Sequence, residues 1–140
     1  MKPPDLTAVD NAGVHTWTGA ADPLKLAASQ AHLRFCAVDL SKAKDRATLF
    51  AEIDSALKLP EHFGHNWDAL ADSLGDFSWR PAPGYVMRLR GSAAAQRALG
   101  AEWNSLVDVL RGAVREWQAR GKPFIALIDD AAALPEWRNL

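Results

Sequence analysis

Every residue of the run Phe124–Ile128 (FIALI) is apolar. A strand of this composition is apolar on both faces, so it belongs inside a parallel sheet that helices cover on both sides. Residues 33–40 and 85–90 are predicted to form two further strands, and long helical segments separate the three. Parallel neighbours require crossovers of about a dozen residues or more. The sequence therefore predicts a small α/β fold with a parallel sheet.

Two helices are predicted between these strands. Asp45 is expected to cap a helix that runs to about Leu57. The clearest helical periodicity, in steps of three and four, runs from Leu99 to Trp117, and Gly121 is expected to end that helix. The strand at residues 85–90 has one mixed face, which includes two arginines, so an edge position or partial exposure is expected. The apolar stripe of the first helix consists of Leu49, Phe50, Ile53 and Leu57.

The first 32 residues are predicted to add a short strand and a helix. Residues 1–13 show no periodic pattern and are interpreted as a loose tail, and residues 14–17 are predicted to form the strand. Asp22 followed by Pro23 is typical of a helix start, an acidic cap before a proline. The apolar face of this helix is expected to consist of Leu24, Leu26, Ala27 and Ala31.

Composition narrows the class of protein. A chain of 140 residues suits a single domain, and 49% hydrophobic with 24% charged residues is ordinary for a globular protein. A net charge of -1 argues against direct binding of nucleic acid, which normally needs a basic surface. The single Cys36 excludes an intrachain disulfide and a zinc motif of several cysteines. With no signal-peptide pattern and no apolar run of about 18 residues, we expect a cytoplasmic protein without membrane segments.

Residues 59–79 form an acidic and aromatic segment that contains no lysine or arginine. Asn66 is placed to cap a short helix, which Gly75 is expected to end. The apolar stripe of this helix would consist of Trp67, Leu70, Ala71 and Leu74. On a neighbouring face, Asp68, Asp72 and Asp76 follow one another at i, i+4 spacing beside His65. Like charges at this spacing destabilise a helix by about 0.2–0.5 kcal/mol per pair. Asp72 lies mid-helix and gains nothing from either helix end, so this face is either a functional surface or one of the solvated acidic faces that are common on helices.

The same segment resembles the signature of the barstar family, intracellular inhibitors of the ribonuclease barnase. The residues that carry the resemblance are Leu59, Pro60, Glu61, Phe63, Gly64, Asn66, Asp68, Ala69, Leu70 and Asp72. The resemblance implies a small three-layer fold, in which helices flank a three-stranded parallel sheet. Within the single domain 1–140, residues 33–130 would form this core, residues 1–32 an N-terminal strand-plus-helix extension, and residues 131–140 a tail.

The resemblance also implies a docking surface. Asp72 matches the family's central aspartate, which occupies the phosphate site of the enzyme, and Asp68 matches a second acidic contact. Glu116 aligns with an acidic residue that makes a peripheral charge contact. His62 and Phe63 fall where barstar has a pair of tyrosines. The remaining predicted contacts are Asn66, Trp67, Asp76 and Phe77, although Trp67 and Phe63 could instead be core residues and Asn66 mainly a helix cap. Several of these positions depart from the family's residues, so the cognate enzyme need not be barnase itself.

The predicted function is inhibition of a small cationic ribonuclease, barnase-like or a toxin nuclease domain, by a protein that is monomeric when free. Acidic side chains on a rigid helix would replace RNA phosphates, with no cofactor, metal or membrane involved. The runner-up is a docking module for another basic protein. A metal site would use His62, His65, Asp68 and Asp72, although Gly64 interrupts their spacing. An acid–base enzyme would pair Asp68 with Asp72 or His65, but no catalytic motif accompanies them.

Overall fold

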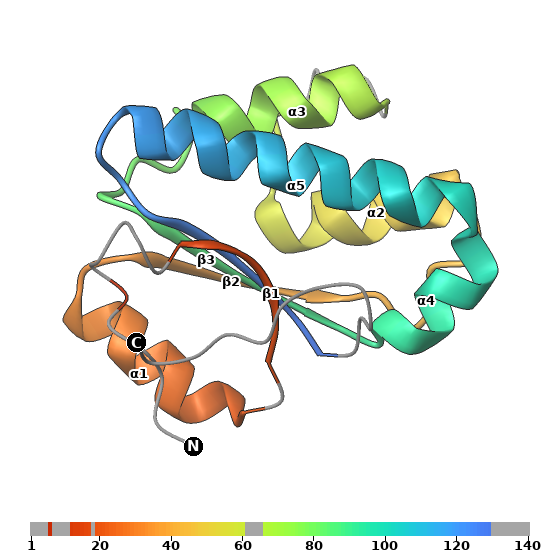
Figure 1. Cartoon of the computed structure of the whole chain (residues 1–140), viewed down its shortest axis with the longest axis horizontal. Helices are drawn as coiled ribbons and strands as arrows, with labels where there is room; N and C mark the ends of the chain where they lie inside the picture. The colour runs from red at the N-terminus through yellow and green to blue at the C-terminus, as the bar shows by residue number, and fades with distance from the viewer. Residues whose placement is uncertain (1–5, 7–11, 18, 61–65, 130–140) are drawn as a thin grey trace.

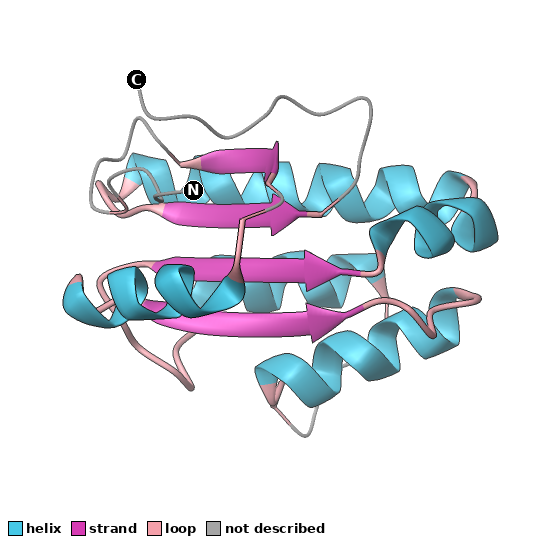
Figure 2. Ribbon diagram, turned by 90° about the horizontal axis from the view of Figure 1, so that it is seen from below, coloured by secondary structure: helices cyan, strands magenta, loops and turns pink. Residues whose placement is uncertain are grey.

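The computed structural model describes residue 6 and residues 12–17, 19–60 and 66–129. Four parallel strands form one sheet in the order β1-β4-β3-β2 (Figures 1 and 2). The strands are β1 (Gly13–Thr16), β2 (Arg34–Asp39), β3 (Tyr85–Arg90) and β4 (Phe124–Ile128). The α/β fold with a parallel sheet is confirmed. The predicted three strands become four because the extension pairs β1 with β4, in the register Val14 with Ala126.

Helices cover both faces of the sheet. They are α1 (Ala21–Gln30), α2 (Arg46–Leu57), α3 (Trp67–Asp76), α4 (Ser92–Leu99) and α5 (Ala101–Ala119). Helices α2, α3 and α5 gather on one face and α1 lies on the other, so the fold has three layers (Figure 1). All five residues of β4 are buried, as expected for an interior strand apolar on both faces. None of the described helices is long and apolar enough to span a lipid bilayer.

The sequence predicted an edge position or partial exposure for β3. The strand lies inside the sheet, between β4 and β2, but it is partly exposed at its two arginines. Arg88 is accommodated by the extension: its guanidinium donates a hydrogen bond to the carbonyl oxygen of Gly19 (2.8 Å) and lies over the ring of Trp17 (5.5 Å). Arg90 ends the strand and is exposed. The cationic side chain of Arg88, on an interior strand, is thus covered by Trp17 and Gly19, which lie far away in the sequence.

The helix boundaries confirm some predictions and correct others. Asp45 caps α2 in a capping box with Thr48, as expected, and the predicted stripe of α2 is buried. Helix α1 begins after Ala20, so Asp22 lies inside its first turn rather than at the cap. Leu26, predicted to be on the apolar face of α1, is 60% exposed, whereas Leu24 and Ala28 are buried.

The long helical pattern is divided in the structure. Leu99 ends the separate helix α4, which the sequence analysis did not predict, and α5 begins after Gly100. Gly100 has φ 56° and ψ −121°, a conformation open essentially to glycine alone. At the other end, Gly121 stops α5 as predicted, with a φ of 73°. Its N–H donates to Gln118 and that of Lys122 donates to Trp117, which completes a Schellman motif.

Candidate docking surface

Helix α3 is held rigidly against α5 and α2. Asn66 caps it as predicted, since its side chain accepts a hydrogen bond from the N–H of Ala69 (2.7 Å). Leu70 and Leu74 are buried, and the buried indole of Trp117 in α5 donates to the carbonyl oxygen of Leu74 (2.8 Å). A buried hydrogen bond and two buried leucines fix one face of α3. Its opposite face is therefore presented to solvent in a defined orientation.

Three aspartates occupy the solvent face of α3. Asp68, Asp72 and Asp76 are all exposed and are spaced one turn apart. Within the described part of the chain, the carboxylates of Asp68 and Asp72 have no hydrogen-bond or ion-pair partner, whereas Asp76 accepts a hydrogen bond from Ser78 (2.7 Å). Neighbouring unpaired carboxylates repel one another, and a cationic ligand would relieve that repulsion.

Glu116 of α5 extends the acidic face toward the carboxyl end of α3. A Cβ atom at Gly75 would meet Oε2 of Glu116 at 2.5 Å, so the absence of a side chain at Gly75 makes room for this carboxylate. Glu116 has a side-chain exposure of 61% and a loose ion pair with Arg120 at 3.5 Å. The prediction that Gly75 ends the helix is wrong, because α3 continues to Asp76. Glu116 therefore lies next to α3 and adds a carboxylate to the face formed by the three aspartates.

A shallow groove of about 260 Å³ lies between α3 and α5. Ala71, predicted to be in the apolar stripe, is instead exposed and lines this groove together with Gly112. Asp108 and Glu116 contribute its two carboxylates. Asp108 was missed by the sequence analysis, although its spacing of eight residues from Glu116, with Gly112 midway, places all three on one side of α5. We call Asp68, Asp72, Asp76, Asp108 and Glu116 the acidic surface.

The sequence of this core matches the family model described as Barstar (barnase inhibitor) over residues 33–129. That match covers well over half of the chain. The chain belongs to the barstar family. No curated protein matches the chain. The barstar match includes β2, β3, β4 and helices α2 to α5, and hence the whole acidic surface, while β1 and α1 precede it.

Two aromatic residues predicted as contacts have structural roles in this barstar-family fold. Phe77 is fully buried and stacks on Tyr85, with ring centroids 4.2 Å apart. It also adopts a left-handed conformation (φ 49°) that ends α3. Its prediction as a partner contact is wrong, because a side chain with no exposed surface cannot touch a partner. The hydrophobic side chain instead completes the core under α3.

Trp67 is partly buried and anchors the start of α3. Its indole N–H donates to Oε2 of Glu102 (2.8 Å), and its ring packs edge-on against Phe50 at 4.9 Å. Oε1 of Glu102 binds Arg46 of α2 at 2.6 Å. The hydrogen bonds from Arg46 and Trp67 hold the pKa of Glu102 below its usual value. This network joins α2, α3 and α5, so Trp67 acts mainly by positioning α3.

The remaining predicted site residues are divided between exposed and undescribed positions. Asn66 is exposed, and its side chain caps α3. His62 and Phe63 lie outside the described residues, as does His65. Among the described residues, no group of three histidines, cysteines, aspartates or glutamates is arranged to hold a metal ion. Cys36 is buried, and burial raises the pKa of its thiol.

Proposed function

We propose that this protein inhibits a small cationic ribonuclease by placing the acidic surface across the enzyme's active site. Asp72 would occupy the position of an RNA phosphate, with Asp68 beside it and Glu116 and Asp108 toward the rim. The observation that carries the proposal is the pair Asp68 and Asp72, which are exposed and have no partner among the described residues, on a helix whose other face is fixed by packing. Membership of the barstar family, described as barnase inhibitors, supports it.

The chemistry of a ribonuclease fits this surface. An enzyme that binds RNA must present cations to the phosphates, and carboxylates on a rigid helix offer those cations negative charge without a bond to cleave. Because the helix that carries the carboxylates is already fixed in place, little backbone entropy is lost on binding. Complementary charge also accelerates encounter, which matters for an inhibitor that must reach the enzyme before cellular RNA does. We accordingly place the protein in the cytoplasm.

The test is a titration of the purified protein into a panel of small basic ribonucleases, with RNA cleavage as the readout. We expect stoichiometric inhibition of the cognate enzyme. Asp72→Ala should weaken binding by about 2–5 kcal/mol, a general range that draws partly on barnase and barstar themselves. Asp22→Ala is the matched control, since Asp22 is also an exposed aspartate of a helix but lies across the sheet in α1.

Three outcomes separate the alternatives. Inhibition by the native protein that persists in Asp72→Ala would contradict the proposed centre of the site. A saturated complex with full nuclease activity would favour a docking module for a basic protein without inhibition. Equal losses in Asp72→Ala and Asp22→Ala would show that general charge, rather than the acidic surface, governs binding.

A further inference from the structure

Strand β2 has one side of its backbone unpaired among the described strands. It is the outermost strand of the sheet and pairs with β3 on its other side (Figure 2). The N–H of Arg34 donates inward to Gly84 (3.0 Å). Because successive residues of a strand alternate in direction, the N–H and C=O groups of Phe35, Ala37 and Asp39 point outward. Backbone donors and acceptors thus line an edge that is open to another extended chain.

This edge has few of the features that prevent pairing with another chain. Proteins usually protect an exposed edge with lysine, proline, a bulge or a covering element. The sequence of β2, RFCAVD, contains neither lysine nor proline, and its register with β3 runs without a bulge. At the centre of the strand, Ala37 is exposed and has a small side chain. The middle of the edge is therefore accessible to a further strand.

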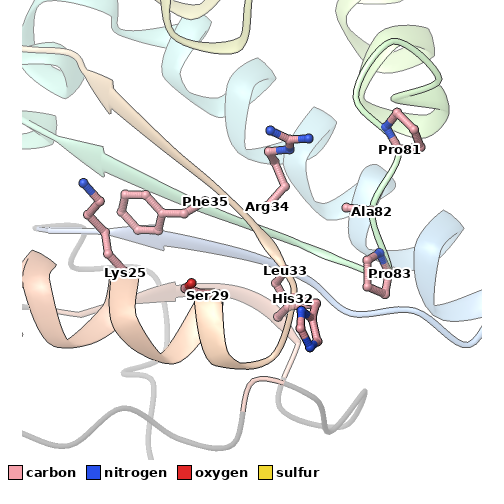
Figure 3. A pocket seen from close by; sticks show the side chains of 9 residues that line it. All are labelled: Lys25, Ser29, His32, Leu33, Arg34, Phe35, Pro81, Ala82 and Pro83. Atoms are coloured by element: carbon pink, nitrogen blue, oxygen red, sulfur yellow. The ribbon is translucent and has the colours of Figure 1, made fainter.

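A hollow of about 450 Å³ adjoins the amino end of this edge (Figure 3). Arg34 and Phe35 both line it, although their side chains point to opposite faces of the sheet. Arg34 is in register with Tyr85, on the face that α5 covers, so Phe35 lies on the face of α1. The loop of residues 81–83 and helix α1 form the two walls. The hollow therefore lies beside the edge itself rather than over one face.

The hollow has a cation on each side of the sheet. Lys25 lines it from α1 and Arg34 from the opposite face, and Figure 3 shows these two side chains on opposite sides of the β2 ribbon. None of the residues that line the hollow is acidic. Within the described part of the chain, neither side chain forms a hydrogen bond or an ion pair. Side chains of an added strand alternate between the two faces, so two consecutive acidic residues would bring one carboxylate to each cation.

The loop that forms the wall opposite α1 is fixed before any ligand arrives. The hydroxyl of Tyr85 donates to the carbonyl oxygen of Arg80 (2.8 Å), just before the loop. Just after the loop, a Cβ atom on Gly84 would meet Pro123 at 2.7 Å and Leu33 at 2.8 Å, so the backbone lies tightly against its neighbours. A preformed wall reduces the conformational entropy that is lost on binding.

We propose that the open edge of β2 binds the acidic carboxyl-terminal segment of a partner protein as an added antiparallel strand. Antiparallel pairing brings the carboxyl end of that segment to the amino end of β2, where the hollow lies. Main-chain hydrogen bonds along the edge would supply affinity, and Lys25 and Arg34 would select two consecutive acidic residues at the end of the segment. The edge contains no residue of the acidic surface, so this site is independent of the proposed inhibition.

The experiment uses the full chain and the peptide Thr-Val-Thr-Val-Thr-Asp-Glu, labelled at its amino end, with fluorescence anisotropy as the readout. We expect a dissociation constant below about 1 mM. The reversed sequence and a peptide that ends in Asn-Gln are the matched ligands. Each should bind about threefold more weakly or worse, since exposed ion pairs contribute little individually but are lost here together.

Two pairs of protein variants test the two parts of the site. Ala37→Pro removes an outward donor and places a ring in the path of the peptide, so affinity should fall by about tenfold or more, whereas Ala37→Thr keeps the donor and should change affinity by less than about twofold. The pairing with β3 is retained in Ala37→Pro, because this N–H points away from β3. Lys25→Glu should weaken binding by about threefold or more, and Arg111→Glu, an exposed cation of α5 that does not line the hollow, should not.

Several results would overturn this assignment. They are the absence of binding at about 1 mM peptide, equal affinities for the three peptides, and equal effects of Ala37→Pro and Ala37→Thr. A native dimer in sedimentation that Ala37→Pro converts to a monomer would assign the edge to a second copy instead. Thermal unfolding shows whether each variant keeps its fold. Ribonuclease inhibition by Ala37→Pro should equal that of the native chain, which distinguishes failure of this site from failure of the acidic surface.

Discussion

At Gly75, the missing side chain leaves room for the carboxylate of Glu116. In Gly75→Ala, the new Cβ would displace the end of a flexible side chain, because the three nearest atoms it would meet all belong to Glu116. Stability should therefore stay the same or rise by up to about 1 kcal/mol, the gain of alanine over glycine in a helix. Binding of the partner should weaken, since Glu116 would be pushed from its position.

A double-variant comparison isolates this effect. If Gly75→Ala acts through Glu116, the pair Gly75→Ala with Glu116→Ala should bind no more weakly than Glu116→Ala alone. Binding is measured by titration calorimetry and stability by urea unfolding. Destabilisation of Gly75→Ala by more than about 2 kcal/mol would instead mean that the backbones of α3 and α5 must separate.

Phe77 provides the opposite case, an aromatic residue near the acidic surface that serves the core. Phe77→Ala should destabilise the fold by about 3–5 kcal/mol, because a fully buried ring leaves a cavity next to Tyr85 and Trp79. Urea unfolding monitored by circular dichroism gives this value. A change of less than about 1 kcal/mol would contradict the assignment of Phe77 to the core.

Among the elements, the junction of α4 and α5 depends on backbone conformation alone. A Cβ atom at Gly100 would meet nothing within 4 Å, yet its positive φ is unfavourable for alanine. Gly100→Ala should therefore cost about 1–3 kcal/mol. Gly112→Ala, inside α5 with only Arg115 at 3.9 Å, is the control and should instead raise stability by up to about 1 kcal/mol. Equal effects in the two variants, measured by thermal unfolding, would contradict this account of the junction.

The start of α4 is held by a carboxylate from the end of β4. Asp129 accepts hydrogen bonds from the N–H groups of Gly91 (2.9 Å) and Ser92 (3.1 Å) and from the Ser92 hydroxyl. Burial raises the pKa of Asp129, but these hydrogen bonds outweigh burial and hold the pKa below its usual value. A lowered pKa in the folded state stabilises the fold above the unfolded pKa of about 3.9, and this contribution is lost as pH falls through the folded pKa.

Asp129→Ala should consequently destabilise the protein at pH 7 by about 1–3 kcal/mol, and the difference from the native chain should shrink below about pH 4. Urea unfolding across this pH range is the measurement. Asp22→Ala serves as the control, since the carboxylate of Asp22 is exposed in the first turn of α1. A destabilisation of Asp129→Ala that is independent of pH would show that the charge of Asp129 plays no part.

Local sequence patterns predicted the elements that depend on local chemistry. The Asp45 and Asn66 caps and the Gly121 stop follow from side-chain and backbone geometry within a few residues, and all three are confirmed. The interior position of β3 was not predictable, because the charge of Arg88 is accommodated by Gly19 and Trp17, which lie about seventy residues away.

Tertiary contacts also decided the details of the candidate site. Phe77 was predicted as a contact from its place in the segment that resembles the barstar family, and only its packing on Tyr85 reveals that it belongs to the core. Asp108 was missed because its relation to α3 depends on how α3 and α5 pack together. The spacing of Asp68 and Asp72 was sufficient to place them on one face, since helical periodicity alone determines it.

For the whole molecule, negative charge is concentrated on one side. The acidic surface lies on α3 and α5, whereas α1 lies on the other side of the sheet (Figure 1). Although the net charge is only -1, the electrostatic potential therefore differs between the two sides of the molecule. An approaching cationic protein would be drawn toward α3 rather than to the molecule as a whole.

This asymmetry predicts how association depends on salt. The association rate with the cognate ribonuclease should fall by about tenfold or more between 10 and 150 mM salt, as the Debye length shortens from about 30 to about 8 Å. Asp68→Asn with Asp108→Asn should flatten this dependence, whereas Asp22→Asn should leave it unchanged. Stopped-flow mixing supplies the rates. Identical salt dependence in all variants would contradict steering by the acidic surface.

The central claim is that the acidic surface occupies the site of RNA phosphates in a ribonuclease. Competition with a short single-stranded DNA tests it most directly, because this ligand has the phosphates of RNA but lacks the 2′-hydroxyl needed for cleavage. The measurement is the apparent affinity of the complex at increasing DNA concentration and constant salt. We predict that affinity falls in proportion to the fraction of enzyme occupied by DNA, for the native chain and for Asp22→Ala alike. A ternary complex, with affinity unchanged at saturating DNA, would contradict the account.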